Sequence, residues 1–216
     1  MTKQDDLVLG PGDDYVHAEP AFESVRRRLE PTDTVLDIGC GFGNVGRYFM
    51  QAGVTVDGIE PDPDRSASAA SVLRHVCRGS LEQALEDDQL RSEYSVVTVL
   101  DVVEHFVDPL EALLQAKRFL APEGRLFLFV PNSAHWSFRR KILKGDWSYS
   151  DSGLFDRTHL RFFDLRTTTD LIRAAGLVER DREYTSPYAS RAVELGLRRM
   201  PTLFALHFLF ELVADG

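Results

Sequence analysis

The chain has 216 residues, of which 44% are hydrophobic and 27% charged, and its formal net charge is −9. This length and composition favour one globular domain with a buried core over a disordered or fibrous chain. The acidic balance argues against nucleic acid as a partner, and the longest apolar run, Leu203 to Val213, is too short to span a bilayer.

Strands and helices are predicted to alternate through residues 22–130. A polar lead over residues 1–14, expected to be mobile, precedes a helix over Phe22–Leu29. The predicted strands are Thr34–Ile38, Val54–Ile59, His75–Arg78, Tyr94–Leu100 and Arg125–Val130. The further predicted helices are Asn44–Ala52, one capped by Asp62, Leu81–Leu90, and one from the cap Asp108 to about Leu120. Because strands that alternate with helices form parallel sheets, this order indicates an α/β fold.

The pattern changes after Asn132. A basic, aromatic helix is predicted over Trp136–Lys144, followed by a long segment rich in Gly, Asp and Tyr. Asp164 is then predicted to cap a helix that ends at Gly176, and the last strands are expected over Leu177–Thr185 and Phe204–Val213. Residues 133–161 have no place in the sheet, and insertions of this length usually carry function. We therefore expect a single domain over residues 1–216, with residues 133–161 as a lid over the substrate.

The run from Val35 to Gly43 is a buried strand that breaks into three alternate glycines, at positions 39, 41 and 43. Glycine permits positive φ and lets a ligand approach the backbone closely, and a strand, glycine turn and helix form a half-site for nucleotide-like cofactors. Such ligands bind beyond the carboxyl ends of the strands. Glu60 ends the next strand, 21 residues after Gly39. We therefore expect its carboxylate to accept hydrogen bonds from both hydroxyls of a ribose.

Two kinds of cofactor fit this turn. Gly41, Gly43 and Gly46 match the dinucleotide fingerprint G-x-G-x-x-G, but that match is weak by itself. Asp37 would be unhelpful beside a pyrophosphate and is better explained by a cationic amino group. No tyrosine is followed by lysine four residues later, the pair that a short-chain reductase would need. The pattern favours a cationic cofactor and leaves a nicotinamide-dependent oxidoreductase and a non-catalytic cofactor-binding protein as alternatives.

Three parts of the chain resemble class I S-adenosylmethionine (SAM)-dependent methyltransferases. The first is the strand, acid and G-x-G-x-G run over residues 35–43. The second part resembles the UbiE/UbiG-like branch and has two motifs. One is Leu100-Asp101-Val102-Val103-Glu104-His105 followed by Asp108-Pro109, and the other is the run over residues 119–126. The third, residues 156–163 with Ala175-Gly176-Leu177, is similar to the family called methyltransferase type 23. The resemblance covers most of residues 33–213. It implies a Rossmann-like fold with a mostly parallel seven-stranded sheet, helices on both faces and an antiparallel C-terminal strand.

The resemblance also implies SAM as cofactor, with S-adenosylhomocysteine (SAH) as product. The methionine end of SAM would lie along the glycine turn, with its ammonium near Asp37. The implied cofactor-binding residues are Asp37, Gly39, Cys40, Gly41, Gly43, Glu60, Pro61, Ser80, Leu81, Leu100, Asp101 and Val102. Relatives commonly carry an acid where this chain has Ser80. Because a hydroxyl accepts a hydrogen bond from the adenine amine only weakly, adenine recognition is expected to depend more on backbone groups.

Methyl transfer to a hydroxyl requires alignment of three atoms and removal of a proton. Orientation can contribute about 7–11 kcal/mol, and a general base roughly 10²- to 10⁴-fold in rate. His105 directly follows a predicted strand, and His159 lies in the insertion. We predict His159 or His105 as the base, with Asp156 orienting His159. The alternatives are that His105 only starts a helix and that Asp156, His159 and Arg161 form a structural network.

Asp101, Glu104 and His105 have the i, i+3, i+4 spacing that places side chains on one helical face. Some relatives with a Glu-x-x-Glu-His arrangement bind Mg²⁺ there. Asp101 has a shorter reach than glutamate, and imidazole is a poor magnesium ligand. We therefore predict no metal, with Mg²⁺ as the alternative, and prefer Asp101 and Glu104 as groups that frame the cofactor site.

Aromatic residues gather in and around the insertion. They can stack on a sugar or ring substrate or pack the lid onto the sheet, and we predict Trp136, Tyr149, Arg161 and Phe162 as substrate-binding residues. The basic run from Arg139 to Lys144 is either a solvated helix face or a site for an anionic acceptor or a membrane surface presenting one.

The predicted function is O-methylation of a small-molecule hydroxyl of the sugar, natural-product, quinone or phenol type, with N-methylation as the alternative. No nucleic acid and no stable membrane insertion are expected, and the protein is expected to be a monomer or homodimer. The polar start has no apolar signal core, and Cys40 and Cys77 indicate no disulfide framework. These features predict a reducing, cytoplasmic setting.

Overall fold

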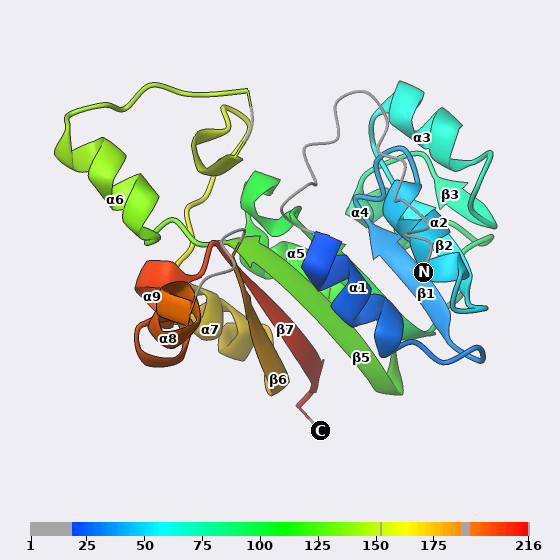
Figure 1. Cartoon of the computed structure of the whole chain (residues 1–216). Coiled ribbons are helices and arrows are strands. Elements are labelled where there is room, and N and C mark those ends of the chain that lie inside the picture. The colour runs from blue at the N-terminus through cyan, green and yellow to red at the C-terminus, as the bar shows by residue number, and fades with distance from the viewer. Residues whose placement is uncertain (1–18, 152, 187–190, 216) are drawn as a thin grey trace, which may run out of the picture.

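The computed structural model describes residues 19–151, 153–186 and 191–215, so the predicted mobile lead over residues 1–14 lies outside the described residues. The strands form one seven-stranded sheet in the order β3-β2-β1-β4-β5-β7-β6 (Figure 1). Their bounds are β1 Thr34–Ile38, β2 Thr55–Ile59, β3 His75–Cys77, β4 Tyr94–Leu100, β5 Leu120–Pro131, β6 Leu177–Thr185 and β7 His207–Ala214.

The sheet is parallel except at one strand. β1 pairs in parallel with β2 and β4, β2 with β3, and β4 with β5. β7 pairs antiparallel with both β5 and β6, so among the described strands it alone runs against the others. The predicted sheet with its antiparallel C-terminal strand is confirmed. The strand order reverses between β1 and β4, which is the point where such sheets bind ligands.

Nine α-helices and two short 3₁₀ turns are described. The helices are α1 Glu19–Arg27, α2 Asn44–Met50, α3 Pro63–Ala69, α4 Leu81–Ala84, α5 Pro109–Lys117, α6 Trp136–Leu143, α7 Leu165–Ala174, α8 Arg191–Arg199 and α9 Pro201–Phe204. The 3₁₀ turns are η2 Val103–His105 and η3 Gly153–Phe155. The predicted caps Asp62, Asp108 and Asp164 all accept hydrogen bonds from backbone N–H groups of the first helical turn.

Two apolar layers cover the two faces of the sheet. Successive strand residues point to opposite faces, and accordingly Val35 packs with α1 and α2, whereas Leu36 packs with α5 and α7. Likewise, Phe127 packs in the layer that contains α1 and α2, and Leu128 packs in the layer that contains α5 and α7. The prediction of helices on both faces is confirmed. The layers leave the carboxyl ends of the parallel strands as the edge at which a ligand can approach.

Three predicted elements differ most from those observed, and the first is β5, which begins at Leu120 rather than at Arg125. The helix predicted over Leu81–Leu90 ends at Ala84, because the Asp87 carboxylate instead bonds the Gln89 N–H and the His75 ring. The last strand begins at His207 rather than at residue 204, because Pro201 starts the short helix α9. The sequence analysis did not predict α8 or α9.

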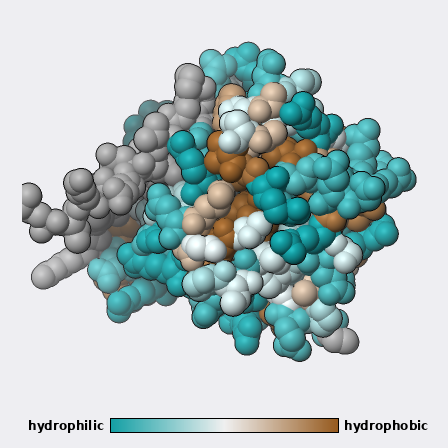
Figure 2. All heavy atoms as spheres, turned by 90° about the vertical axis from the view of Figure 1, so that its right-hand side faces the viewer, coloured by the Kyte–Doolittle hydropathy of each residue, from teal (hydrophilic) through white to brown (hydrophobic). Residues whose placement is uncertain are grey.

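The two ends of the molecule differ in surface and shape. Figure 2 views the end where β3 and α3 lie, and hydrophilic residues cover most of this face around an apolar area near its middle. At the other end, α6 stands away from the sheet, and a long loop leads back from it (Figure 1). Among the described residues no helix is both long enough and apolar enough to cross a membrane. Because α6 and the loop after it stand away from the sheet (Figure 1), we call the residues between β5 and α7 the outlying segment.

Candidate functional site

The glycine turn after β1 is held against the end of β2. Gly39, Gly41 and Gly43 have φ of +72°, +54° and +81°, in the left-handed region that favours glycine. The N–H groups of Gly39 and Cys40 donate to the Ile59 carbonyl at 2.8 and 3.1 Å. A Cβ on Gly39 would lie 2.6 Å from a Val102 methyl. The turn therefore requires glycine there, and Val102 packs directly on it.

Glu60 lies beside this turn, as the sequence predicted. Its side chain is buried, and its Oε2 accepts a hydrogen bond from the Gly41 N–H at 2.9 Å. Oε1 accepts one from the Asp62 N–H at 2.9 Å. A carboxylate offers about four acceptor positions. The two backbone bonds fix the carboxylate in place and leave acceptor positions for the two hydroxyls of a ribose.

Asp37 is a buried acid at the end of β1. Its Oδ1 accepts a hydrogen bond from the Thr98 hydroxyl at 2.7 Å. Burial raises the pKa of Asp37 to about 7, against the opposing effect of the Thr98 bond. A cation placed beside the carboxyl would favour its charged form. The position suits the ammonium of a methionine-type cofactor.

A pocket opens at this turn. It is lined by Asp37, Gly39, Cys40, Gly41, Phe42, Asn44, Val45 and Leu100. Five of these were predicted as cofactor-binding residues, whereas Phe42, Asn44 and Val45 were missed although they directly follow the glycine run. Burial raises the pKa of the Cys40 thiol well above its usual range, so Cys40 lines the pocket as an apolar group.

The other predicted cofactor residues near β2 and β3 lie outside the pocket lining. Pro61 is exposed just after β2, and Leu81 is buried at the start of α4. Ser80 caps α4: its hydroxyl accepts from the Gln83 N–H at 3.2 Å, and its own N–H donates to the Gln83 side chain at 2.8 Å. The roles of these three residues in cofactor binding stay predictions.

Asp101 marks the end of β4. Its φ of +53° makes it the one non-glycine residue with positive φ among those described. Its backbone N–H donates to the Phe129 carbonyl at 3.0 Å. Burial raises the pKa of its carboxyl to about 7, and the buried Oδ1 has no hydrogen-bond partner among the described residues. Strained backbone of this kind persists where the surroundings enforce it, often at functional sites.

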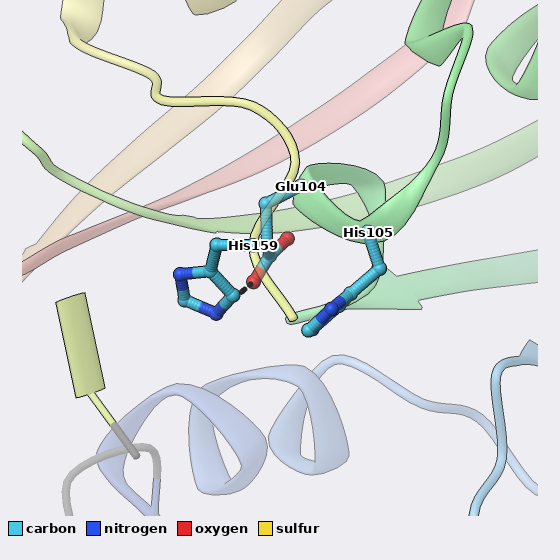
Figure 3. Close-up of side chains that lie close together, drawn as sticks. All are labelled: Glu104, His105 and His159. Atoms are coloured by element: carbon cyan, nitrogen blue, oxygen red, sulfur yellow. Dashed lines mark ion pairs between the residues drawn. The ribbon is translucent and has the colours of Figure 1, made fainter. Parts of the chain in front are cut away.

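Glu104, His105 and His159 meet next to this position (Figure 3). Glu104 and His105 belong to η2, and His159 comes from the returning half of the insertion. The Glu104 carbonyl accepts hydrogen bonds from the backbone N–H groups of residues 160 and 161 at 2.9 and 3.0 Å. His159 Nε2 lies 3.8 Å from Glu104 Oε1, and the two imidazole rings are 4.9 Å apart. The structure thus brings both predicted histidines together.

The protonation of this group follows from its burial. The Glu104–His159 distance is that of an ion pair, but burial and the neighbouring His105 lower the pKa of His159. Burial and the charge of Asp101 raise the pKa of Glu104 well above its usual range. The raised pKa of Glu104 and the lowered pKa of His159 both favour the uncharged form of each group. His105 Nδ1 lies 3.1 Å from the Thr158 carbonyl, which only accepts, so Nδ1 is the donor in this contact.

Asp156 and Arg161 hold the segment that carries His159. The Asp156 carboxylate accepts bonds from the N–H and hydroxyl of Thr158 at 2.7 and 2.6 Å. The negative charge of Asp156 partly offsets the lowering of the His159 pKa. Glu104, however, is the acid within ion-pair distance of His159. The Arg161 guanidinium donates to the carbonyls of residues 107 and 160. These bonds match the structural network foreseen as the alternative, and the orienting role of Asp156 stays a prediction.

The predicted substrate-binding aromatics lie on the outlying segment. Trp136, Tyr149 and Phe162 are 36%, 66% and 50% exposed, and with Arg161 they are absent from the described pocket lining. The Phe162 ring packs against Phe138, with ring centres 5.7 Å apart. Phe138 in turn stacks on Phe155 at 4.3 Å. Packing of the segment thus accounts for Phe162, and contact of these residues with a substrate stays a prediction.

Glu104, His105 and His159 could also hold a divalent metal ion. One ligand atom from each lies within 4.8 Å of the others, and the buried Glu104 Oε2 has no hydrogen-bond partner among the described residues. Two imidazoles and one carboxylate suit Zn²⁺ or another transition metal better than Mg²⁺, which prefers oxygen ligands. The sequence named Glu104 as a framing group and, with Asp101 and His105, as part of an alternative Mg²⁺ site, but it did not place His159 with them. No local spacing relates residues 104 and 159, so their meeting could not be read from the chain.

Solved structures with the same fold are methyltransferases. A methyltransferase in complex with the Haloferax volcanii Trm112 methyltransferase activator superposes with a TM-score of 0.65 and 17% identity over 94% of this chain and 90% of that one. Magnesium protoporphyrin IX methyltransferase from Synechocystis PCC 6803 with bound SAH gives a TM-score of 0.63 and 18% identity over 92% and 84%. The fold is therefore that of class I methyltransferases.

The sequence shows the family itself. The model of the methyltransferase domain called Methyltransf_23 matches residues 15–179, and the chain belongs to this family of class I SAM-dependent methyltransferases, as predicted. The ubiquinone biosynthesis O-methyltransferase of Cereibacter sphaeroides is 30% identical over 79% of this chain and 72% of that protein. The protein of that name from Haemophilus ducreyi is 32% identical over 45% of each chain, so the alignment spans about half of that relative. Membership decides against the oxidoreductase alternative.

Proposed function

We propose that this chain transfers the methyl group of SAM to a hydroxyl group of a small-molecule acceptor. The observation that carries the proposal is the meeting of two histidines, His105 and His159, beside the end of β4, the strand next to the glycine turn. The ubiquinone biosynthesis O-methyltransferases to which the chain is similar support an oxygen acceptor on a ring compound. A neutral amine would need less help from a base, and N-methylation is the alternative that the acceptor decides.

The residues of the glycine turn would bind and orient the cofactor. When bound, SAM supplies a methyl group already activated on a sulfonium sulfur. Asp37 would meet the ammonium, and the fixed Glu60 carboxylate would accept the ribose hydroxyls. Leu100 lines the same pocket at the end of β4. Because the leaving group needs no further activation, the main contribution of these residues is alignment.

His159 would take the proton of the acceptor hydroxyl. Its lowered pKa keeps the ring neutral near pH 7. Once the proton arrives, the new positive charge would favour ionisation of Glu104 at 3.8 Å, and the carboxylate would then stabilise the imidazolium. His105 is more exposed and presents a free Nε2, since its Nδ1 donates to the Thr158 carbonyl. We assign proton acceptance to this pair, with His159 in the first role.

A metal-assisted version of the same reaction is the second candidate. Glu104, His105 and His159 would hold the ion, as their ligand atoms within 4.8 Å of one another allow. The ion would supply a Lewis acid that lowers the pKa of the acceptor hydroxyl. The same residues then act as ligands rather than as a base. Chelation separates the two versions, because only the metal-assisted one loses activity on dialysis against EDTA and recovers it with Zn²⁺ or Mn²⁺.

A methyl-acceptor screen tests the proposed function. The full chain is incubated with SAM labelled on its methyl group and with catechols and quinols, phenols, sugars, lipid-linked glycans and amines. We expect label on an oxygen of one acceptor, identified by mass spectrometry, and its loss in the His159→Ala variant. Label on nitrogen would replace hydroxyl transfer by N-methylation. SAH binding without transfer to any acceptor would favour the non-catalytic alternative.

A further inference from the structure

One side of α6 is exposed along its whole length. Trp136, Arg139, Arg140, Leu143 and Lys144 are all exposed, and their i, i+3, i+4, i+7, i+8 spacing places them on one helical face. We call these five residues the α6 outer face. The opposite side packs inward: Phe138 is buried against Phe155, and Lys141 Nζ lies 3.9 Å from the Phe155 ring centre. The orientation of the helix is therefore fixed by packing, with its outer face directed away from the protein.

Large apolar side chains are concentrated around this face. Twelve large hydrophobic residues are exposed in the described chain, and six of them lie between residues 136 and 162. Leu143 is 86% exposed, and Trp147 and Tyr149 in the following loop are 66% exposed each. Apolar groups gathered in this way usually mark an interaction surface rather than the ordinary scatter of exposed residues.

The charge of the segment is opposite to that of the whole chain. Residues 133–162 hold six basic and three acidic residues, a net charge of +3, whereas the whole chain has −9. The side chains of Arg140 and Lys144 make no hydrogen bond or ion pair with the residues that the structure describes. Two unpaired cations therefore stand beside Leu143 on a helix that projects from an acidic body (Figure 1).

We propose that the α6 outer face, with Trp147 and Tyr149, docks on an anionic lipid surface. Basic side chains bind lipid phosphates, Trp and Tyr favour the level of the headgroups, and an exposed leucine can enter the acyl boundary. The acidic remainder of the chain is repelled by the same surface, which orients the molecule with α6 toward the lipid. A free phosphate is a poorer match, because the cations lie along the convex side of a helix.

The docking helix is connected to the histidine site by packing. Phe138 on its buried side contacts Phe162, two residues after the Leu160 N–H that bonds the Glu104 carbonyl. The segment that carries His159 is therefore packed against α6. The docking surface does not depend on the proposed chemistry, and a binding assay without SAM or acceptor can test it.

Vesicle flotation of the full chain tests the proposal. We expect binding to vesicles of phosphatidylcholine with phosphatidylglycerol, no binding to phosphatidylcholine alone, and loss of binding at high salt. A basic residue near an anionic surface contributes about fivefold in affinity, so Arg140→Gln with Lys144→Gln should weaken binding on the order of twentyfold. Leu143→Ser should weaken it further, because the apolar contact is lost.

Matched variants elsewhere on the surface are the controls. Arg91→Gln with Arg118→Gln removes two exposed cations outside the insertion, and Leu114→Ser removes an exposed leucine of α5. These variants should bind like the native chain. The proposal is overturned if the native chain does not float, or if the α6 variants and the controls behave alike. It is also overturned if inorganic phosphate displaces the vesicles more strongly than chloride of equal ionic strength, since that identifies a free-anion site.

Discussion

The cofactor half and the acceptor half of the site are built in different ways. Most of the proposed cofactor half lies within residues 37–60, where the glycine turn is bonded to the neighbouring strand end, and Leu100 at the end of β4 completes it. The acceptor half joins η2 to a segment more than fifty residues away, through the His105–Thr158 contact and the backbone bonds at Glu104. The first half depends on local sequence, whereas the second depends on where the insertion packs. Changes in one half should therefore leave the other largely intact.

The largest expected effect comes from the acceptor half. His159→Ala should lower the rate of methyl transfer by roughly 10² to 10⁴, the usual contribution of a general base, while the affinity for SAH stays unchanged. His75→Ala is the control, because His75 pairs with Asp87 at the far strand β3 and should retain activity. Rates are compared on the acceptor that the screen identifies. A parallel loss of SAH affinity in His159→Ala would show that the two halves are not separable.

A smaller effect is expected in the cofactor half as pH changes. Because its pKa is about 7, the Asp37 carboxyl is mostly protonated at low pH, and it attracts a cation only when ionised. SAH affinity should therefore fall about tenfold from pH 8 to pH 6, since one pKa unit corresponds to a factor of ten. Calorimetry across this range measures it. Asp37→Asn should bind weakly with little pH dependence, and Asp64→Asn, an exposed acid of α3, should titrate like the native chain.

The smallest expected effect is on stability. The pKa of Glu104 is higher in the folded than in the unfolded protein, so folding binds a proton and stability falls as pH rises from the unfolded pKa of about 4.5. Glu104→Gln removes this cost and should raise Tm at pH 8 more than at pH 5. A gain of about 1 kcal/mol corresponds to roughly 2–4 °C for a chain of this size.

The same Glu104→Gln variant should transfer methyl groups more slowly than the native chain, because its amide cannot stabilise a protonated His159. Thermal melts at both pH values, together with transfer rates, check the two expectations. A variant that is less stable and fully active would contradict the assignment of Glu104 to the acceptor half.

The sequence predicted the local structure around the glycine turn well because its signals are local. Strand, acid, glycine turn and the caps Asp62 and Asp108 each depend on neighbouring residues, and the structure has them where they were expected. The pairing of Glu104 with His159 could not be predicted, because it depends on backbone bonds between residues far apart in the chain. The outward direction of α6 depends likewise on the contact of Phe138 with Phe155.

The most direct test of the separation between the two halves is calorimetric titration of SAH into the native chain, Glu60→Ala and His159→Ala. Hydrogen bonds to a charged group contribute about 1.5–3 kcal/mol each, so loss of the ribose contacts should weaken binding to Glu60→Ala at least about tenfold. His159→Ala should bind like the native chain. Unchanged affinity in Glu60→Ala, or no binding of SAH to the native chain, would contradict the placement of the cofactor between Asp37 and Glu60.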